Sequence, residues 1–354
     1  MTAPGTIDVH GHFYPSELLP DTVAAEASAV PRLVIDSDHA GRIIRGGEVF
    51  RNVRSELWDT TRRLADMNRS GLGVQVISPM PVALHIQAPA QIYREYCSWF
   101  NTAMARAVRE AEGRLVGLGL VPFHTPQDCI AELEHIASLG LRGVEIGTRI
   151  GELELDDPAL DYFYTAAEGL GLSLLVHPVD GGGGALRRSG FLYDFGLGMP
   201  SDTSLAAAAL VFGGVLERYP QLRVATVHGC GTFPWAYPRL RLGAEMAGTH
   251  TPDQLNRVVS RLYTDTLVFD RAHLPLLTHR FGNDRIMFGS DFPFIPGQPD
   301  DGLSDLVAMT EELGPETVAR ILRKNTLGFL GLCDSVPQHT TSPEKSGLVT
   351  STNH

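Results

Sequence analysis

Two histidines stand one residue apart near the start of the chain, in the segment Asp8-Val9-His10-Gly11-His12. Side chains alternate along a β-strand, so His10 and His12 would point the same way if a strand runs through them. Two imidazoles on one side of a strand end can bind a single metal ion. This short motif is weak support when taken alone.

Three later apolar runs also end in a polar residue that can bind a metal. SLLVHP ends on His177, RVATVHG ends on His228, and IMFGSDFP ends on Asp291. A lone buried histidine is usually a core residue, but four runs that all end in a possible ligand favour a shared site. Imidazole and carboxylate groups together suit Zn²⁺ and related divalent ions.

These residues need a sheet whose strands all end at the same edge. Short β-rich runs alternate with longer helical patterns, which is typical of a parallel α/β sheet. Eight such units predict a closed (β/α)₈ barrel, a TIM barrel, whose active site lies at the carboxyl ends of the strands. An open doubly wound sheet is the alternative, but it would need a Gly-rich phosphate-binding turn after the first strand. The expected strands are 6–10, 72–79, 115–121, 142–147, 172–177, 222–228, 262–267 and 285–291, and helices are expected at 90–113, 126–139, 158–170 and 203–218.

One segment interrupts the alternation of strands and helices. Residues 31–54 contain three β-like runs separated by DHAG and GG, which predicts a small antiparallel insertion after the first strand. Residues 335–354 are rich in Ser, Thr, Pro and Lys, which favours a disordered tail. We therefore expect a single barrel domain over residues 1–334.

Charge and composition restrict the function. The formal net charge of −12 opposes binding to nucleic acid and to anionic membranes. The longest apolar run, 205–216, is shorter than the roughly 20 residues that span a bilayer. Four cysteines without a CxxC pair and an N-terminus without a secretory pattern lead us to expect a cytoplasmic protein with reduced thiols.

Several longer motifs resemble those of one enzyme family. They are EVFRNVRSELWD (48–59), LVHPVD (175–180), VHGCGTFPW (227–235), PRLRL (238–242) and FGSDFPF (288–294). Together with the possible ligands, these motifs resemble the amidohydrolase superfamily, and within it the aminocarboxymuconate-semialdehyde decarboxylase group. The resemblance runs from Ile7 to about Leu332.

The resemblance implies a role for each residue of the set. One divalent ion, zinc or alternatively manganese, would be held by four ligands, while His228 would act as a general base or proton shuttle. Arg51 and Arg239 would grip a substrate carboxylate, the second from a neighbouring subunit, so a homodimer is expected. The fork of an arginine side chain suits this task because it pairs with a carboxylate through two hydrogen bonds. The implied metal ligands are His10, His12, His177 and Asp291.

Other residues are expected near the substrate. His85 follows the second strand, Phe191 stands where the family commonly has a pocket tryptophan, and Phe294 closes the FGSDFPF motif. The glycine run 181–184 departs from the family pattern. Glu145 should point into the barrel, where it could support a second metal ion or, more simply, form hydrogen bonds within the protein.

The expected reaction is non-oxidative decarboxylation of a small unsaturated or aromatic carboxylic acid. Loss of CO₂ leaves electron density on carbon, which a metal ion can help to accept. Two mechanisms fit these residues: addition of a hydroxide generated with His228, or protonation of a ring carbon by Asp291. A hydrolase or hydratase that uses the same activated water is the alternative function.

Overall fold

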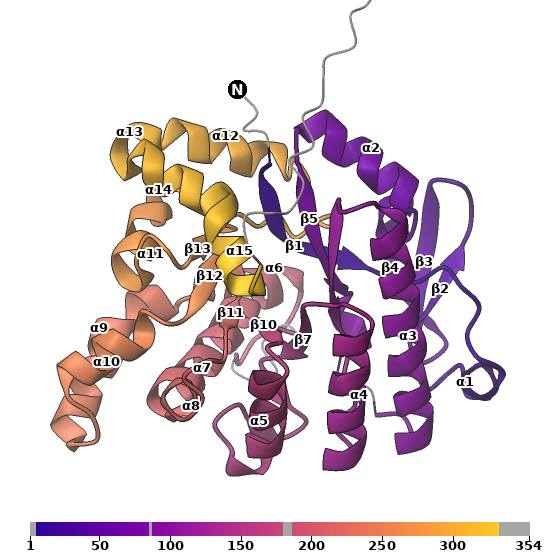
Figure 1. The fold of residues 1–354 in the computed structure, drawn as a ribbon, viewed down its shortest axis with the longest axis horizontal. Coiled ribbons are helices and arrows are strands. Elements are labelled where there is room, and N and C mark those ends of the chain that lie inside the picture. Colours follow the sequence, from indigo (N-terminus) through magenta and orange to yellow (C-terminus); the bar gives the residue numbers. More distant parts are fainter. Residues whose placement is uncertain (1–4, 85–86, 180–185, 333–354) are drawn as a thin grey trace, which may run out of the picture.

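The protein was examined as a computed structural model that describes residues 5–84, 87–179 and 186–332. Eight strands form one parallel sheet in the order β1-β5-β6-β7-β10-β11-β12-β13. A parallel bridge between Gly11 and Phe292 joins the first strand to the segment after the last, so the sheet curls into a barrel. Helices surround it (Figure 1). The barrel strands are Ile7–Phe13, Val74–Pro79, Leu115–Gly119, Gly143–Gly147, Ser173–His177, Val224–Thr226, Tyr263–Asp265 and Ile286–Met287.

The prediction of a (β/α)₈ barrel is confirmed, with each of the eight expected strands in place. Every residue of β1, β5, β7 and β10 is buried, as expected for parallel strands that are covered on both faces. The last three strands are shorter than predicted because their ends turn into loops. His228 and Asp291 follow those strands with positive φ angles of 56° each, which a β-ladder does not accommodate.

The longer helices α3 and α4 end within three residues of their predicted bounds, but the segment predicted as one helix over 203–218 is two. The helix is interrupted at Gly213 and Gly214, where Gly214 has a φ of 76°. The helices are α1 Asp21–Ala25, α2 Thr60–Ser70, α3 Ala90–Glu110, α4 Pro126–Ser138, α5 Asp161–Gly169, α6 Phe191–Tyr193, α7 Met199–Phe212, α8 Val215–Arg218, α9 Phe233–Ala247, α10 Pro252–Val259, α11 Leu274–Phe281, α12 Asp300–Ala308, α13 Thr310–Leu313, α14 Pro315–Ala319 and α15 Asn325–Leu330.

The predicted antiparallel insertion is also present. Strands β2 (Arg32–Ile35), β3 (Ala40–Arg45) and β4 (Glu48–Arg54) form a separate antiparallel sheet. Gly46 and Gly47 turn the chain between β3 and β4 with positive φ angles. In Figure 1 this sheet lies beside α3, at the opposite end of the long axis from α9 and α10. A second, two-stranded hairpin of β8 (Arg149–Ile150) and β9 (Leu153–Glu154) follows β7.

One continuous helical run, Phe191–Phe212, is 22 residues long and apolar enough to cross a membrane by length and composition alone. It joins α6 and α7 through a π-helical turn, Asp194–Gly198. The longest apolar run of the sequence, 205–216, overlaps this helical run only at residues 205–212. Within this run α7 packs against β10 and α9, and 33% of the most apolar window is buried. A single run of this kind is weak support for a membrane span.

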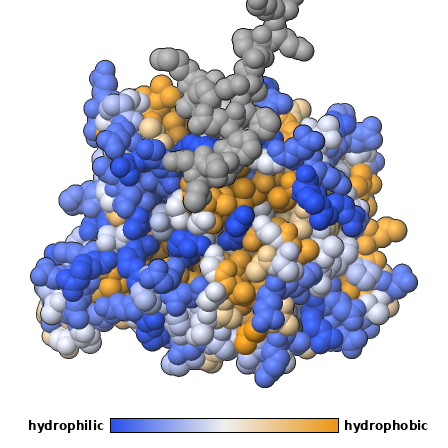
Figure 2. Space-filling model, in the orientation of Figure 1, coloured by the Kyte–Doolittle hydropathy of each residue, from blue (hydrophilic) through white to orange (hydrophobic). Residues whose placement is uncertain are grey.

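The surface shown in Figure 2 is mainly hydrophilic, with hydrophobic residues gathered near its centre. Among the described residues, Cys97, Cys129 and Cys230 are buried and form no disulfide. The predicted tail, 335–354, and the glycine run, 181–184, lie outside the described residues.

Candidate metal centre and active site

Strand β1 brings two histidines to one point. His10 and His12 are fully buried, and their ring centroids are 5.2 Å apart. The intervening Gly11 packs closely against β5, since a Cβ atom there would meet the Gln75 side chain at 3.0 Å and the Val76 carbonyl oxygen at 3.1 Å. Glycine is therefore favoured between the histidines, because a side chain there would crowd β5 by a few tenths of an ångström.

His177 at the end of β10 and Asp291 after β13 complete a cluster with the two histidines of β1. One ligand atom from each of the four residues lies within 4.8 Å of the others. The Oδ1 atom of Asp291 is 2.9 Å from His12 Nε2 and 3.7 Å from His10 Nε2. The sequence analysis named these four residues as a ligand set, and the fold brings them together.

In all three histidines of the cluster, Nδ1 has an acceptor and Nε2 makes no hydrogen bond, although Nε2 of His12 lies 2.9 Å from Asp291 Oδ1. Nδ1 of His10 lies 2.7 Å from Asp265 Oδ2, that of His12 lies 3.2 Å from the Pro79 carbonyl, and that of His177 lies 2.7 Å from the Pro178 carbonyl. These acceptors place the proton on Nδ1 and leave a lone pair on Nε2. The three buried Nε2 atoms lack a hydrogen-bond partner.

This donor set fits a divalent metal ion. Three imidazole nitrogens and one carboxylate oxygen are typical zinc ligands. Burial of three unpaired Nε2 atoms is otherwise unfavourable, and a bound ion would account for it. Burial and the neighbouring imidazoles also lower the pKa of His177 well below its usual value. A neutral imidazole is the form that binds a metal.

His228 lies beside the cluster at the end of β11. Its ring centroid is 5.3 Å from that of His10 and 5.1 Å from that of His177. Its Nε2 atom is 3.8 Å from Asp291 Oδ2, whereas His12 is close to the other carboxylate oxygen, Oδ1. The side chain is 13% exposed, so it can face both the cluster and a bound molecule.

The turn that carries His228 has an unusual backbone. Four successive residues, from His228 to Gly231, have φ angles between 56° and 65°. Such angles are unfavourable for residues other than glycine and are often found at functional sites. The Gly229 N–H donates to Asp265 Oδ1 at 2.9 Å, which helps hold the turn. The same Asp265 therefore orients His10 and fixes the His228 turn.

Asp265 and Asp8 are site residues that the sequence analysis did not identify. Burial alone would raise the pKa of Asp265, but hydrogen bonds from His10 and Gly229 outweigh it and lower that pKa. Asp8 accepts hydrogen bonds from His10 N, Gln75 Nε2 and both N and Oγ of Ser290. Asp8 thus joins β1, β5 and the segment before Asp291. Asp265 also ends a strand, so the rule that found the ligands could have found it.

A buried arginine supports this network from α2. Arg63 has no exposed surface, and its guanidinium donates to the carbonyl of His12 and to Gln75 Oε1. Its Cζ lies 5.1 Å from the centroid of the Phe292 ring. Burial lowers the pKa of Arg63 to about 10, which still leaves it charged at neutral pH. Arg63 therefore ties α2 to two of the three chain segments that carry ligands, β1 and the segment after β13.

The insertion reaches the site through Arg51 and Phe294. The Phe294 ring lies against His12, with ring centroids 5.4 Å apart. The Arg51 guanidinium lies over the same Phe294 ring, with Cζ 4.6 Å from its centroid. Arg51 is exposed on β4. The predicted substrate-binding residues Arg51 and Phe294 are thus placed next to the cluster, at its solvent side.

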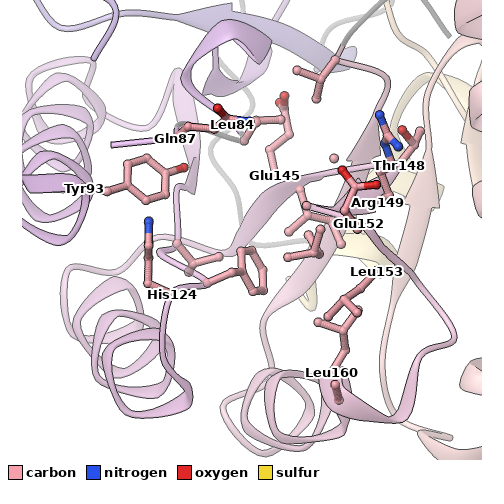
Figure 3. Close-up of a pocket in the computed structure, with 18 of the residues that line it drawn as sticks. Leu84, Gln87, Tyr93, His124, Glu145, Thr148, Arg149, Glu152, Leu153 and Leu160 are labelled. Atoms are coloured by element: carbon pink, nitrogen blue, oxygen red, sulfur yellow. The ribbon is translucent and has the colours of Figure 1, made fainter. Parts of the chain in front are cut away.

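A cavity of about 520 Å³ opens beside the cluster, lined by the loops after β5, β6 and β7 (Figure 3). Glu145 of β7 is the residue that connects it to the cluster, since its Oε2 lies 4.0 Å from His12 Nδ1. Glu145 is fully buried, and burial raises its pKa to about 7. Neither of its carboxylate oxygens has a hydrogen-bond partner among the described residues.

Two predicted site residues do not lie at the cluster of their own chain. Phe191 is 76% exposed and stacks on Phe195 instead. Arg239 is exposed on α9, and among the described residues it has neither an ion pair nor a hydrogen bond. His85 lies outside the described residues. The described part of the chain also assembles no second group of three possible ligands around Glu145.

Comparison with known proteins agrees with this geometry. A family model described as amidohydrolase matches residues 7–332. A 2-amino-3-carboxymuconate-6-semialdehyde decarboxylase of Dictyostelium discoideum is 32% identical over 291 residues, which cover 81% of this chain and 80% of that protein.

Solved structures show the same barrel at lower identity. The IDCase of Metarhizium anisopliae superposes with a TM-score of 0.75 at 22% identity, covering 93% of this chain and 97% of that one. A dihydroxybenzoic acid decarboxylase of Polaromonas sp., solved with manganese and the inhibitor 2-nitroresorcinol, gives a TM-score of 0.71 at 20% identity, covering 93% and 97%.

Proposed function

The chain belongs to the amidohydrolase family, and we propose that it is a metal-dependent decarboxylase of a small aromatic or unsaturated carboxylic acid. The observation that carries this proposal is the convergence of three unpaired Nε2 atoms and Asp291 beside His228. The similarity to a named decarboxylase over four-fifths of the chain supports the choice of reaction. A reduced, cytoplasmic setting remains the expected location.

The proposed metal ligands are His10, His12, His177 and Asp291. We favour zinc because three imidazoles and one carboxylate match its preferred ligands, with manganese as the alternative because the Polaromonas structure holds that ion. A divalent ion bound there supplies a Lewis acid toward which electron density can move as CO₂ leaves.

The remaining residues bind the acid and move a proton. Arg51 is exposed on β4 and its guanidinium stacks on Phe294 at the solvent side of the cluster, so its N–H groups can pair with a carboxylate through two hydrogen bonds. The face of Phe294 offers an apolar contact for a ring or a conjugated chain. His228, which faces Asp291 and is partly exposed, is placed to deliver the proton that replaces CO₂ on carbon.

Arg239 belongs to a second subunit's site in this proposal. On α9 it shares one helical face with Trp235, Leu242 and Met246, at spacings of four, three and four residues. Trp235 and Met246 are 82% and 81% exposed, and Leu242 is 54% exposed. An exposed apolar face that surrounds an unpaired arginine is typical of a subunit interface. We therefore propose a homodimer that contacts through α9.

Metal analysis tests the ligand assignment. His177→Ala and Asp291→Ala should each reduce the bound metal to a small fraction of one ion per chain, since either change removes one of four ligands. Metal content is measured by elemental analysis after purification with limiting zinc. Full occupancy in both variants would contradict the assignment, and His279→Ala, at an exposed histidine, is the control.

The reaction itself is tested by following CO₂. The metal-loaded protein is incubated with a panel of hydroxybenzoic and conjugated unsaturated acids, and released CO₂ is measured together with the shortened product. Decarboxylation of at least one acid, lost in Asp291→Ala, is the expected result. Hydrolysis of an amide or lactone without any CO₂ release would instead favour the hydrolase alternative.

A further inference from the structure

Glu145 is a buried carboxylate without a partner in the wall of the cavity beside the cluster. It has no exposed surface, and both Oε atoms are unpaired among the described residues. Figure 3 shows its side chain among the lining residues, with Leu84 nearby. A buried carboxylate normally accepts several hydrogen bonds, so this group lacks the partners that would offset its burial.

The neighbouring polar groups do not supply those partners. His12 Nδ1 is 4.0 Å from Glu145 Oε2, beyond hydrogen-bond distance, and lies 3.2 Å from the Pro79 carbonyl instead. Ser78 interacts with Glu145 and lowers the pKa of its carboxyl, but its hydroxyl donates to the Gly11 carbonyl at 3.3 Å. Two other polar residues of the lining are also paired elsewhere: Tyr93 donates to the Ala83 carbonyl, and Thr148 donates to Asp202. Within the described lining, Glu145 is the buried side chain whose oxygens remain unpaired.

A second metal ion does not account for this arrangement. The four proposed ligands form the group of possible metal ligands found among the described residues, and Glu145 is not part of it. A carboxylate alone provides too few ligands for a zinc site. The missing partners must then come from a molecule that enters the cavity, whose volume of about 520 Å³ accommodates a small ring or conjugated chain.

We propose that Glu145 determines substrate specificity by accepting a hydrogen bond from a hydroxyl or amino group of the acid. The substrate would then carry a donor substituent on the side of its ring or chain that faces β7, away from Arg51. The inference rests on the proposed function, because it takes the cavity as the place of that substituent while the carboxylate stays beside the cluster, whose residues do not line the cavity. Glu145 would bind and orient the acid, while the proton transfer stays with His228.

Binding calorimetry tests this role without depending on turnover, provided that only acids that release no CO₂ during the titration are compared. The probes are benzoate, 3-aminobenzoate and 2-, 3- and 4-hydroxybenzoate, each titrated into metal-loaded enzyme. The wild type should bind at least one substituted acid about tenfold more tightly than benzoate, as for a hydrogen bond to a charged group. In Glu145→Leu this preference should disappear, while benzoate binds within about threefold of the wild type.

Two further variants keep the test sharp. Glu145→Gln keeps the shape and one acceptor, so it should fold and retain only a few-fold preference. Glu152→Gln removes a charge from an exposed position on the same lining and should leave the preference ratio unchanged. The proposal is overturned if Glu145→Gln and Glu145→Leu keep the full preference, if the wild type shows none, or if metal content falls in Glu145→Gln.

The outcome separates this proposal from the proposed function. If CO₂ is released from an acid but both Glu145 variants bind all probes as the wild type does, the specificity role fails and decarboxylation stands. If no acid of the panel loses CO₂ while the donor preference is present and depends on Glu145, decarboxylation fails and the binding role stands.

Discussion

At His10, His12 and His177, Nδ1 is the ring nitrogen with a hydrogen-bond acceptor and Nε2 is the ring nitrogen without one. The pairing partners differ, since one is a carboxylate and two are backbone carbonyls, yet each fixes the proton on Nδ1. A ligand set therefore depends on acceptors that the ligand residues do not themselves provide. Among these acceptors, only the carboxylate of Asp265 can be altered by substitution.

Asp265→Asn should reduce metal affinity by about 10–100-fold. The Oδ1 atom of Asp265 already accepts from Gly229 N and Leu267 N, so an asparagine would keep its oxygen there and turn its NH₂ group toward His10. His10 would then have to accept at Nδ1 and carry its proton on Nε2, where a metal cannot bind. Competition with a chelator measures the change. Asp36→Asn, at an exposed acid paired with Arg42, is the control, and an equal loss there would argue against this reason.

His228→Ala should keep the metal and lose most of the decarboxylase activity. The residue faces Asp291 Oδ2 from outside the ligand group, and proton transfer by a positioned side chain is typically worth about 10²–10⁴-fold. Metal content and the rate of CO₂ release are measured on the same preparation. A variant within a few-fold of the wild-type rate would remove His228 from the mechanism.

The ligands were predictable because each follows an apolar strand, and parallel strands end together. The acceptors were not, because pairing of His10 with Asp265 joins residues 255 positions apart and depends on strand order. Phe191 shows a different limit. Its expected place was counted through the glycine run, where sequence position constrains geometry least, and the structure leaves it 76% exposed.

Among the elements, α2 contributes to the site although it carries no ligand. Its apolar face covers the barrel, yet Arg63 replaces an apolar residue on that face and reaches His12 and Gln75. The sequence gave no signal of this role, since an arginine in an amphipathic helix is usually exposed. The strands, the larger helices and the insertion were predictable from periodicity. The break at Gly213 was not, because glycine pairs also occur inside continuous helices.

Arg63→Met should destabilise the protein by about 2–5 kcal/mol, because it leaves the His12 carbonyl and Gln75 without their buried donor. Denaturant unfolding measures the loss, and metal affinity should fall with it because β1 is no longer held. The adjacent Arg62 is about one-third exposed and pairs with Asp59 at the surface. Arg62→Met should therefore cost no more than about 1 kcal/mol. Similar losses in the two variants would deny Arg63 its special role.

On the scale of the whole molecule, the insertion and α9 lie at opposite ends of the long axis (Figure 1). Arg51 belongs to the first of these and Arg239 to the second. An acid held by both would therefore lie between two copies of the chain, with Arg239 supplied by the neighbour. The exposed apolar face of α9 gives this proposal a physical basis that sequence alone could only suggest through Trp235.

Mixing two inactive variants, Arg239→Ala and His228→Ala, tests the shared site. A mixed dimer would combine one intact His228 with an Arg239 from the other chain, which restores up to about half of its sites by symmetry. Activity is followed after subunit exchange, and size-exclusion chromatography with light scattering confirms dimers. No recovery from folded and exchanging variants would show that each chain relies on its own Arg239.

The closure of the barrel between Gly11 and Phe292 also has a consequence for synthesis. Asp8 and Ser290, which bond to each other, are 282 positions apart. At ordinary translation rates, on the order of 15–60 s pass between the appearance of the first two histidines and that of Asp291. Throughout that time the growing chain can offer an ion only an incomplete set of ligands. The complete ligand set is therefore available only after Asp291 has been made, and a ribosome that stops before residue 291 releases a chain that lacks one of the four proposed ligands.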